Sequence, residues 1–267
     1  MKRSLKSALA SLRIGIAAER AYLFDFVVGV FFIPLAYFLI EVAFWTGLIQ
    51  TSANGALAGF TTADYLSYFL WLLLRIGGLN WRFERDMIAD VNSGAVNAFL
   101  LRPSSFFEYN LMRLLGQKML TVLVMTPVVV GIAWGFNLPF HLERLPAALL
   151  MGFLYLILTF SLHFAVACGA FFYDNVYSLN ITKNMLLWFL TGETMPLDLL
   201  PAPIARVVIA LPFSAGVYLP AAYLSGRIGT AEFLPGFVSL AVGGLLFALL
   251  ARWLWMAGLK NYSGTGA

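Results

Sequence analysis

Residues 147–171 have the sequence AALLMGFLYLILTFSLHFAVACGAF, a run without Asp, Glu, Lys or Arg. A helix that crosses a bilayer needs about 20 mostly apolar residues, so this stretch is long enough to span a membrane. Of the 267 residues in the chain, 61% are hydrophobic and only 11% are charged. Soluble globular chains have about 25% charged residues, so this chain has too little polar surface for a water-facing particle. The sequence therefore predicts an all-α, polytopic integral membrane protein.

Further apolar runs along the chain predict six spans in a single transmembrane domain, 1–267. The second predicted span, 65–79, is short and depends on its flanking aromatic residues to cross the bilayer. An even number of spans places both termini on the same side, whereas a seventh span at 204–224 would place the C-terminus outside. The six predicted spans are 26–49, 65–79, 119–136, 147–171, 176–190 and 234–256.

The basic residues determine the predicted orientation. Cytoplasmic loops of membrane proteins carry an excess of Lys and Arg. With both termini cytoplasmic, 14 of the 17 Lys and Arg residues lie in inner segments, and the outer segments hold only Arg144, Arg206 and Arg227. The same bias explains the net charge of +4, so we expect no nucleic-acid partner.

The N-terminal residues 1–22 have an amphipathic pattern. Leu5, Leu9, Leu12 and Ile16 recur at helical spacing among basic residues, which predicts a helix in the inner headgroup plane, in contact with membrane lipid. A frayed basic tail is the alternative. The following apolar run, 26–49, is much longer than the 7–15 residues, roughly, of a signal-peptide core, so it is interpreted as a retained span.

The cytoplasmic residues 80–104 are highly charged. Met87, Ile88, Val91 and Ala95 form an apolar stripe at helical spacing, and Asn92-Ser93-Gly94 breaks the helix. A short apolar turn, 96–101, follows. The charged residues are expected on the other faces of the first helix, namely Arg82, Glu84, Arg85, Asp86 and Asp90. The pattern fits either an interfacial anchor or a docking knob for a cytosolic partner.

The outer residues 191–229 contain five of the 11 prolines. Proline lacks a backbone donor and disfavours a continuing helix. The apolar pieces between these prolines, 204–211 and 215–224, are each too short to cross a bilayer. We therefore predict a re-entrant hairpin of two short helices that dip into the outer leaflet and cap the bundle.

Two motifs in these segments resemble those of type-2 ATP-binding-cassette (ABC) exporter permeases. VNSGAVNAFLLRP resembles the loop at their coupling helix, which docks on the ATPase; the matching residues are Val91, Gly94, Val96, Asn97, Leu100, Arg102 and Pro103. Asn97 replaces an acid, so a role that needs that charge does not carry over. The outer hairpin is similar too, at Phe189, Leu190, Gly192, Pro196, Leu197, Pro201, Leu211, Pro212, Phe213, Tyr218, Pro220 and Gly226.

The resemblance implies a permease of the inner membrane that works as a dimer with an identical or homologous second permease. Two copies of a cytosolic ATPase would bind ATP and Mg²⁺ and drive export of a lipid, drug, peptide or glycan. This chain has no GxxxxGK[ST], HExxH or GxSxG motif and a single cysteine, Cys168. We therefore expect no catalytic residue, metal or cofactor in it. An ATP-independent carrier or channel, and a structural subunit of a membrane complex, are the alternatives.

Glu41, His163 and Lys183 lie within predicted spans, and Glu193 lies just after the fifth. Acids in membranes are expensive, so Glu41 and Glu193 are candidates for the translocation path, with a purely structural role as the alternative. Lys183 is expected to extend its amine towards the inner interface. His163 is interpreted as a satisfied residue of the helix bundle.

Overall fold

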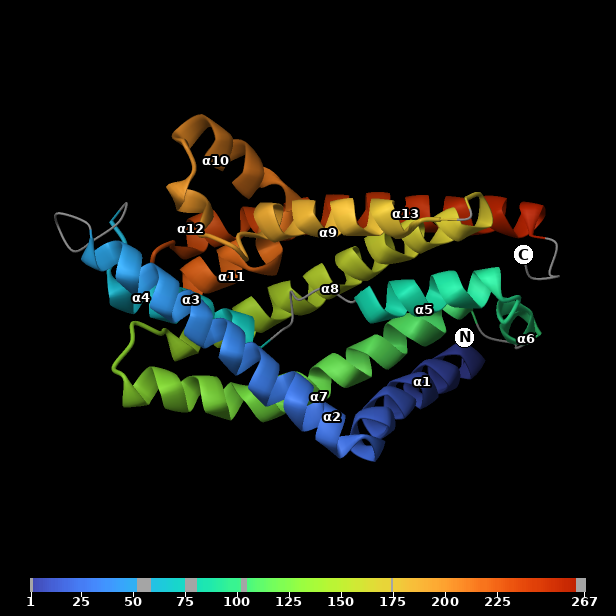
Figure 1. Ribbon diagram of the computed structural model, residues 1–267, viewed down its shortest axis with the longest axis horizontal. Coiled ribbons are helices and arrows are strands. Elements are labelled where there is room, and N and C mark those ends of the chain that lie inside the picture. Colours follow the sequence, from blue (N-terminus) through green and yellow to red (C-terminus); the bar gives the residue numbers. More distant parts are fainter. Residues whose placement is uncertain (1, 52–58, 75–80, 102–104, 174, 263–267) are drawn as a thin grey trace.

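The computed structural model describes residues 2–51, 59–74, 81–101, 105–173 and 175–262, and in these ranges it contains helices and no strands (Figure 1). The predicted all-α class is confirmed. The helices are α1 (Lys2–Ala21), α2 (Leu23–Val27), η1 (Val28–Phe32), α3 (Ile33–Gln50), α4 (Thr62–Leu73), α5 (Trp81–Asn92), α6 (Val96–Leu100), α7 (Phe106–Gly135), η2 (Leu142–Arg144), α8 (Leu145–Ala167), η3 (Cys168–Phe171), α9 (Tyr177–Thr191), η4 (Leu197–Leu199), α10 (Ala202–Ala210), η5 (Pro212–Gly216), α11 (Tyr218–Leu224), α12 (Thr230–Phe233) and α13 (Pro235–Asn261).

Within the part of the chain that the structure describes, four helical stretches are long and apolar enough to cross a membrane. They contain the predicted first, fourth and sixth spans and all but the last residue of the third. The first is continuous from α2 to α3 through the single π-helical turn η1. Their bounds are Leu23–Gln50, Phe106–Gly135, Leu142–Phe171 and Thr230–Asn261.

The predicted second and fifth spans correspond to shorter helices. α4 has 12 residues and α9 has 15. At 1.5 Å per residue these helices are roughly 18 and 22 Å long, against a hydrocarbon core of about 30 Å. Thr61 caps the start of α4 and forms a capping box with Asp64, and residues 75–80, which follow the C-cap Leu74, lie outside the described ranges.

The bundle has two buried apolar clusters, one towards each end. One surrounds the aromatic residues of α4, such as Tyr68 and Trp71, and includes every residue of α11 except Pro220. The other gathers Met87 of α5 with Phe106 of α7 and Phe164 of α8. In Figure 1, α5, α6, the start of α1 and the end of α13 lie at one end of the molecule, and α10–α12 lie towards the other.

α1 is a helix, as predicted, and it packs along the first half of α7 (Figure 1). Two glycines allow this close approach. A Cβ added to Gly15 would lie 2.1 Å from the Arg113 carbonyl oxygen, and one added to Gly116 would lie 2.3 Å from the Leu12 carbonyl oxygen. The backbones of the two helices therefore touch, and α1 is fixed to the protein along this seam.

We expect Gly116→Ala to destabilise the protein by about 1–3 kcal/mol, because the new methyl group has to push the two backbones apart. Gly131→Ala on the same helix is the matched control. Its Cβ meets nothing within 4 Å, so a gain of about 0.5–1 kcal/mol from helix propensity is expected. Thermal unfolding in detergent would measure both, and a Gly116→Ala protein as stable as Gly131→Ala would refute the seam.

Candidate functional site

The 80–104 segment contains two helices joined by a sharp turn. α5 ends at Asn92, and Gly94 has a φ of +78°, in the left-handed region that glycine adopts readily. The Asn97 amide then donates to the Gly94 carbonyl at 3.1 Å, at the start of α6. The predicted break at 92–94 and the short apolar helix after it are confirmed.

Apolar contacts hold one face of this segment on the bundle. Met87, Val91 and Val96 are buried, and the ring of Phe83 lies 4.7 Å from that of Phe160 in α8, measured between centroids. Val91 and Val96 therefore belong to the inward face, where they fix the shape of the segment.

The opposite face of the segment is exposed. The Leu101 side chain is 88% exposed and that of Leu100 43%, and Asn97 is exposed beside them. Leu101 has no place in the family-like pattern, and its one signal in the sequence is that it is a second leucine beside Leu100. Arg102 and Pro103 lie outside the described residues.

The outward face of α5 is charged. Arg85 and Asp86 are exposed, and Asp90 is half-buried one turn further on. Burial raises the pKa of the Asp90 carboxyl above its ordinary value, and the nearby Asp86 carboxylate adds to this rise. The segment thus combines exposed charged side chains on α5 with exposed leucines at Leu100 and Leu101, the two kinds of residue that form the rim and the core of a protein interface.

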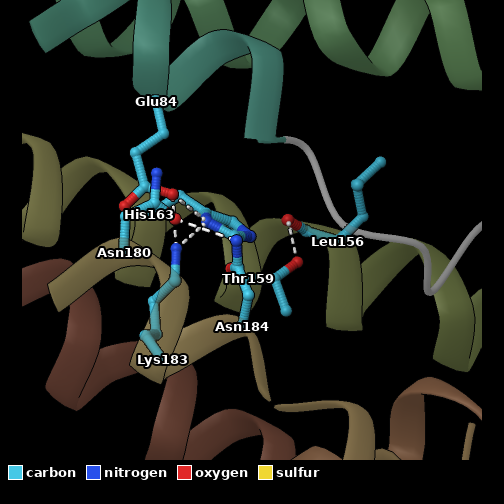
Figure 2. Close-up of polar contacts among 7 residues, drawn as sticks. All are labelled: Glu84, Leu156, Thr159, His163, Asn180, Lys183 and Asn184. Atoms are coloured by element: carbon cyan, nitrogen blue, oxygen red, sulfur yellow. Dashed lines mark hydrogen bonds and ion pairs between the residues drawn. The ribbon is translucent and has the colours of Figure 1, made fainter. Parts of the chain in front are cut away.

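Glu84 does not lie on this charged face, which corrects the prediction. Its side chain is 0% exposed and points into the bundle towards α8 and α9 (Figure 2). Glu84 Oε2 lies 2.9 Å from His163 Nδ1, and the Lys183 ammonium donates to the same oxygen. Glu84 lies three and four residues before Met87 and Ile88, so helical spacing places it in line with their stripe, and the expectation of an outward position rested on its charge alone.

Lys183 is also buried, so the predicted extension of its amine to the inner interface is wrong. The side chain is 9% exposed and contacts both Glu84 and His163. An isolated charge in a low-dielectric interior is very costly, and an opposite charge at contact distance offsets much of that cost. Glu84, which lies 79 residues before His163 in the chain, supplies this opposite charge. Its carboxylate therefore keeps the Lys183 amine inside the bundle.

Other polar groups surround this triad of Glu84, His163 and Lys183. Asn184, the residue after Lys183 in α9, donates a hydrogen bond of 2.9 Å to the Asn180 side chain. Thr159 is bonded to backbone carbonyls of its own helix (Figure 2). Three buried polar atoms near the triad have no partner within the described residues: Glu84 Oε1, His163 Nε2 and Asn184 Oδ1.

The outer hairpin begins where α9 ends. Gly192 has a φ of +81°, and its carbonyl accepts a hydrogen bond of 2.8 Å from the Tyr68 hydroxyl of α4. The two predicted short helices are present as α10 and as η5 with α11. They are not equivalent, however: α10 is mostly exposed, whereas every residue of α11 is buried against neighbours that include α4 and α8. Half of the hairpin is therefore core rather than a cap.

The predicted hairpin residues serve different local purposes. Pro196 and Pro220 are buried, and Pro201 lies at the N-cap of α10. Pro212 opens η5, and Phe213 beside it packs against Phe247 of α13, with 6.0 Å between ring centroids. The prolines thus set the ends of the short helices, as their missing backbone donors predict.

The two candidate path acids lie on different elements. Glu41 of α3 accepts a 3.0 Å hydrogen bond from the Trp45 indole, and that indole stacks on Tyr65 of α4. Glu193 follows the Gly192 turn and is half-buried, and its amide donates to the Thr191 hydroxyl and the Trp188 carbonyl.

The comparisons with known proteins agree with this architecture. Residues 32–266 match the family model described as "ABC-2 family transporter protein", which covers every described element from the end of η1 onwards. No curated protein matches the sequence. Because the family model covers most of the chain, and the described helices are those of a multi-pass membrane protein, the chain belongs to the ABC-2 family of transporter proteins and is a permease of that family.

Proposed function

We propose that this permease exports an amphipathic substrate across the inner membrane, driven by ATP hydrolysis in a separate ATPase that docks on the 80–104 segment. The observation that carries the proposal is the exposed face of α6 and Leu101. Two exposed leucines belong to a segment that also carries exposed charged residues and whose other face is buried. Apolar residues inside a polar rim are the usual composition of a docking surface.

Its position supports the same assignment. α5 and α6 lie at the end of the molecule that holds the start of α1 and the end of α13 (Figure 1), and the predicted inner segments carry 14 of the 17 basic residues. We infer that this end is cytoplasmic. ATP and Mg²⁺ would be bound there by the ATPase, and this chain would supply none of their ligands.

We further propose that α4 and α9 complete six spans. Each helix is too short to cross the bilayer alone. However, most residues of α4 are buried against neighbouring elements, and beyond α9 the chain continues through the short helices η4 and η5. Irregular backbone is tolerated at membrane depth where protein covers it. In this arrangement 1–267 is one transmembrane domain, 1–22 an interfacial helix, 80–104 the coupling segment and 191–229 the outer re-entrant hairpin.

The transport unit in this proposal contains two permeases, identical or homologous, and two ATPase copies. Two global states with different nucleotide affinity are the physical requirement for ATP-driven transport. Glu41 and Glu193 are the acids proposed to line the path. A lipid, drug, peptide or glycan substrate is compatible with the apolar bundle.

Co-purification in mild detergent tests the proposal. The tagged full chain is recovered from its native cells, and mass spectrometry identifies what accompanies it. A stoichiometric ABC ATPase is the expected result, and a second permease beside it would establish a heterodimer. Recovery without any ATPase in several detergents would contradict the proposal and favour an ATP-independent carrier or a structural subunit.

A further inference from the structure

The buried triad connects three helices that are far apart in the sequence. Glu84 belongs to α5 of the 80–104 segment, His163 to α8 and Lys183 to α9. One atom, Glu84 Oε2, is the common partner of His163 Nδ1 and of the Lys183 ammonium (Figure 2). The proposed docking segment is therefore bonded directly to the helix that leads to the outer hairpin.

Stability alone does not account for the triad. A buried ion pair often contributes no more than well-packed apolar residues of similar volume, because desolvation of both charges offsets their attraction. The segment already has apolar attachment through Phe83 and Met87. A charged contact adds a fixed register instead, because only one position of α9 places the Lys183 amine on the Glu84 carboxylate.

α9 is attached to the molecule along one narrow stripe. Its buried residues recur at helical spacing, while apolar residues on its other faces, such as Leu186 and Phe189, are exposed. Lys183 is the one charged residue of this stripe in α9, so the triad provides the ionic attachment of the helix. The stripe consists of Asn180, Lys183, Leu187 and Thr191.

The far end of α9 enters the outer hairpin. Thr191 lies eight residues after Lys183, or roughly 12 Å along the helix axis at 1.5 Å per residue. The next residue, Gly192, is bonded to Tyr68 of α4, and α9 packs against η5 of the hairpin. A helix transmits an axial or tilting displacement over this length as a rigid element.

We propose that Glu84, His163 and Lys183 form a joint that transmits movement of the 80–104 segment through α9 to the outer hairpin. The three are positioning residues, and the joint rests on the proposed function, since the movement comes from the docked ATPase. ATP binding displaces α5, the triad carries α9 with it, and the surroundings of the hairpin residues after Gly192 change.

A reporter cysteine in the hairpin tests the joint. The single native cysteine is buried and is first replaced by Cys168→Ala. Thr194→Cys then places a thiol at an exposed position two residues after Gly192. The complex of permease and ATPase is purified, and the rate of labelling by a membrane-impermeant maleimide is measured without nucleotide and after trapping with ATP, Mg²⁺ and vanadate.

The decisive variant replaces the triad with apolar residues, Glu84→Met/His163→Leu/Lys183→Met, which removes all three polar groups together. We expect it to keep the ATPase bound and to lose the nucleotide-dependent change in labelling rate. Lys183→Arg preserves the ion pair and is expected to retain that change. A purely structural triad would leave the apolar variant responding like the parent.

The outcomes separate the joint from the proposed function. Absence of the ATPase from the parent complex removes the proposed function and the joint together. With the ATPase bound, an unchanged labelling rate in the parent, or a full response in the apolar variant, overturns the joint alone. If the apolar variant does not fold, Glu84→Gln, which keeps the shape of the side chain and removes its charge, is measured in the same way, and a full response there also overturns the joint.

Discussion

Lys183→Met is expected to lower the free energy of unfolding by about 3–5 kcal/mol, the usual cost of removing one member of a buried ion pair. The substitution keeps the apolar stem of the side chain and removes only its charge. Glu84, 0% exposed, would then keep a carboxylate in the bundle with His163 as its remaining partner. Thermal unfolding of the purified protein in detergent, followed by circular dichroism, measures the loss.

Two further variants make this result specific. Glu84→Gln/Lys183→Met removes both charges and is expected to recover much of the lost stability, since no unpaired charge stays buried. Lys260→Met removes an exposed lysine near the end of α13 and is expected to change stability by no more than about 0.5 kcal/mol. A Lys183→Met protein as stable as Lys260→Met would show that Lys183 and Glu84 are not paired in the bundle.

Leu101→Asp is expected to abolish co-purification of the ATPase while leaving the fold intact. Leu101 is 88% exposed, so the folded permease loses almost no packing when it is replaced. In the complex, the same side chain would be at the centre of the docking surface, where replacing a buried anchor commonly costs 2 kcal/mol or more, roughly a thirtyfold loss of affinity. The ratio of ATPase to permease after purification measures the effect.

Phe136→Asp is the matched control for this experiment. Phe136 is also an exposed apolar residue, at 72%, but it follows the last turn of α7, whereas Leu101 lies shortly before the first. The two ends of this 30-residue helix are roughly 45 Å apart. ATPase recovery should stay at the parental level with Phe136→Asp. Equal loss in both variants would indicate general damage, and no loss in either would move the docking surface elsewhere.

Several features of the fold followed from local sequence signals. Uncharged runs such as 147–171 predicted the long helices, because a helix that crosses a bilayer must be apolar over the thickness of the hydrocarbon core. Asn92-Ser93-Gly94 predicted the end of α5, since a left-handed residue was needed there and glycine supplies it. The prolines of 191–229 predicted short helices, because each removes a backbone donor.

The sequence was less informative about α4 and α11. The predicted second span has 15 residues, whereas the corresponding helix, α4, has 12. α11 was expected to cap the bundle but is part of its core. Periodicity counts apolar residues on a face, but α11 is apolar all round. Whether such a helix faces lipid or protein depends on which neighbours the chain brings to it, here α4 and α8.

By itself, the sequence determined that this protein is helical and crosses a membrane, where its helix breaks fall, and which segments resemble ABC permeases. Those properties depend on hydrophobicity and backbone preferences of neighbouring residues. Only the tertiary structure decided that Glu84 is buried, that Lys183 does not extend to the interface, and that Leu101 is exposed. A charged residue on a helix is placed inward only when a partner from elsewhere offsets its desolvation, and that partner lies 99 residues away in the chain.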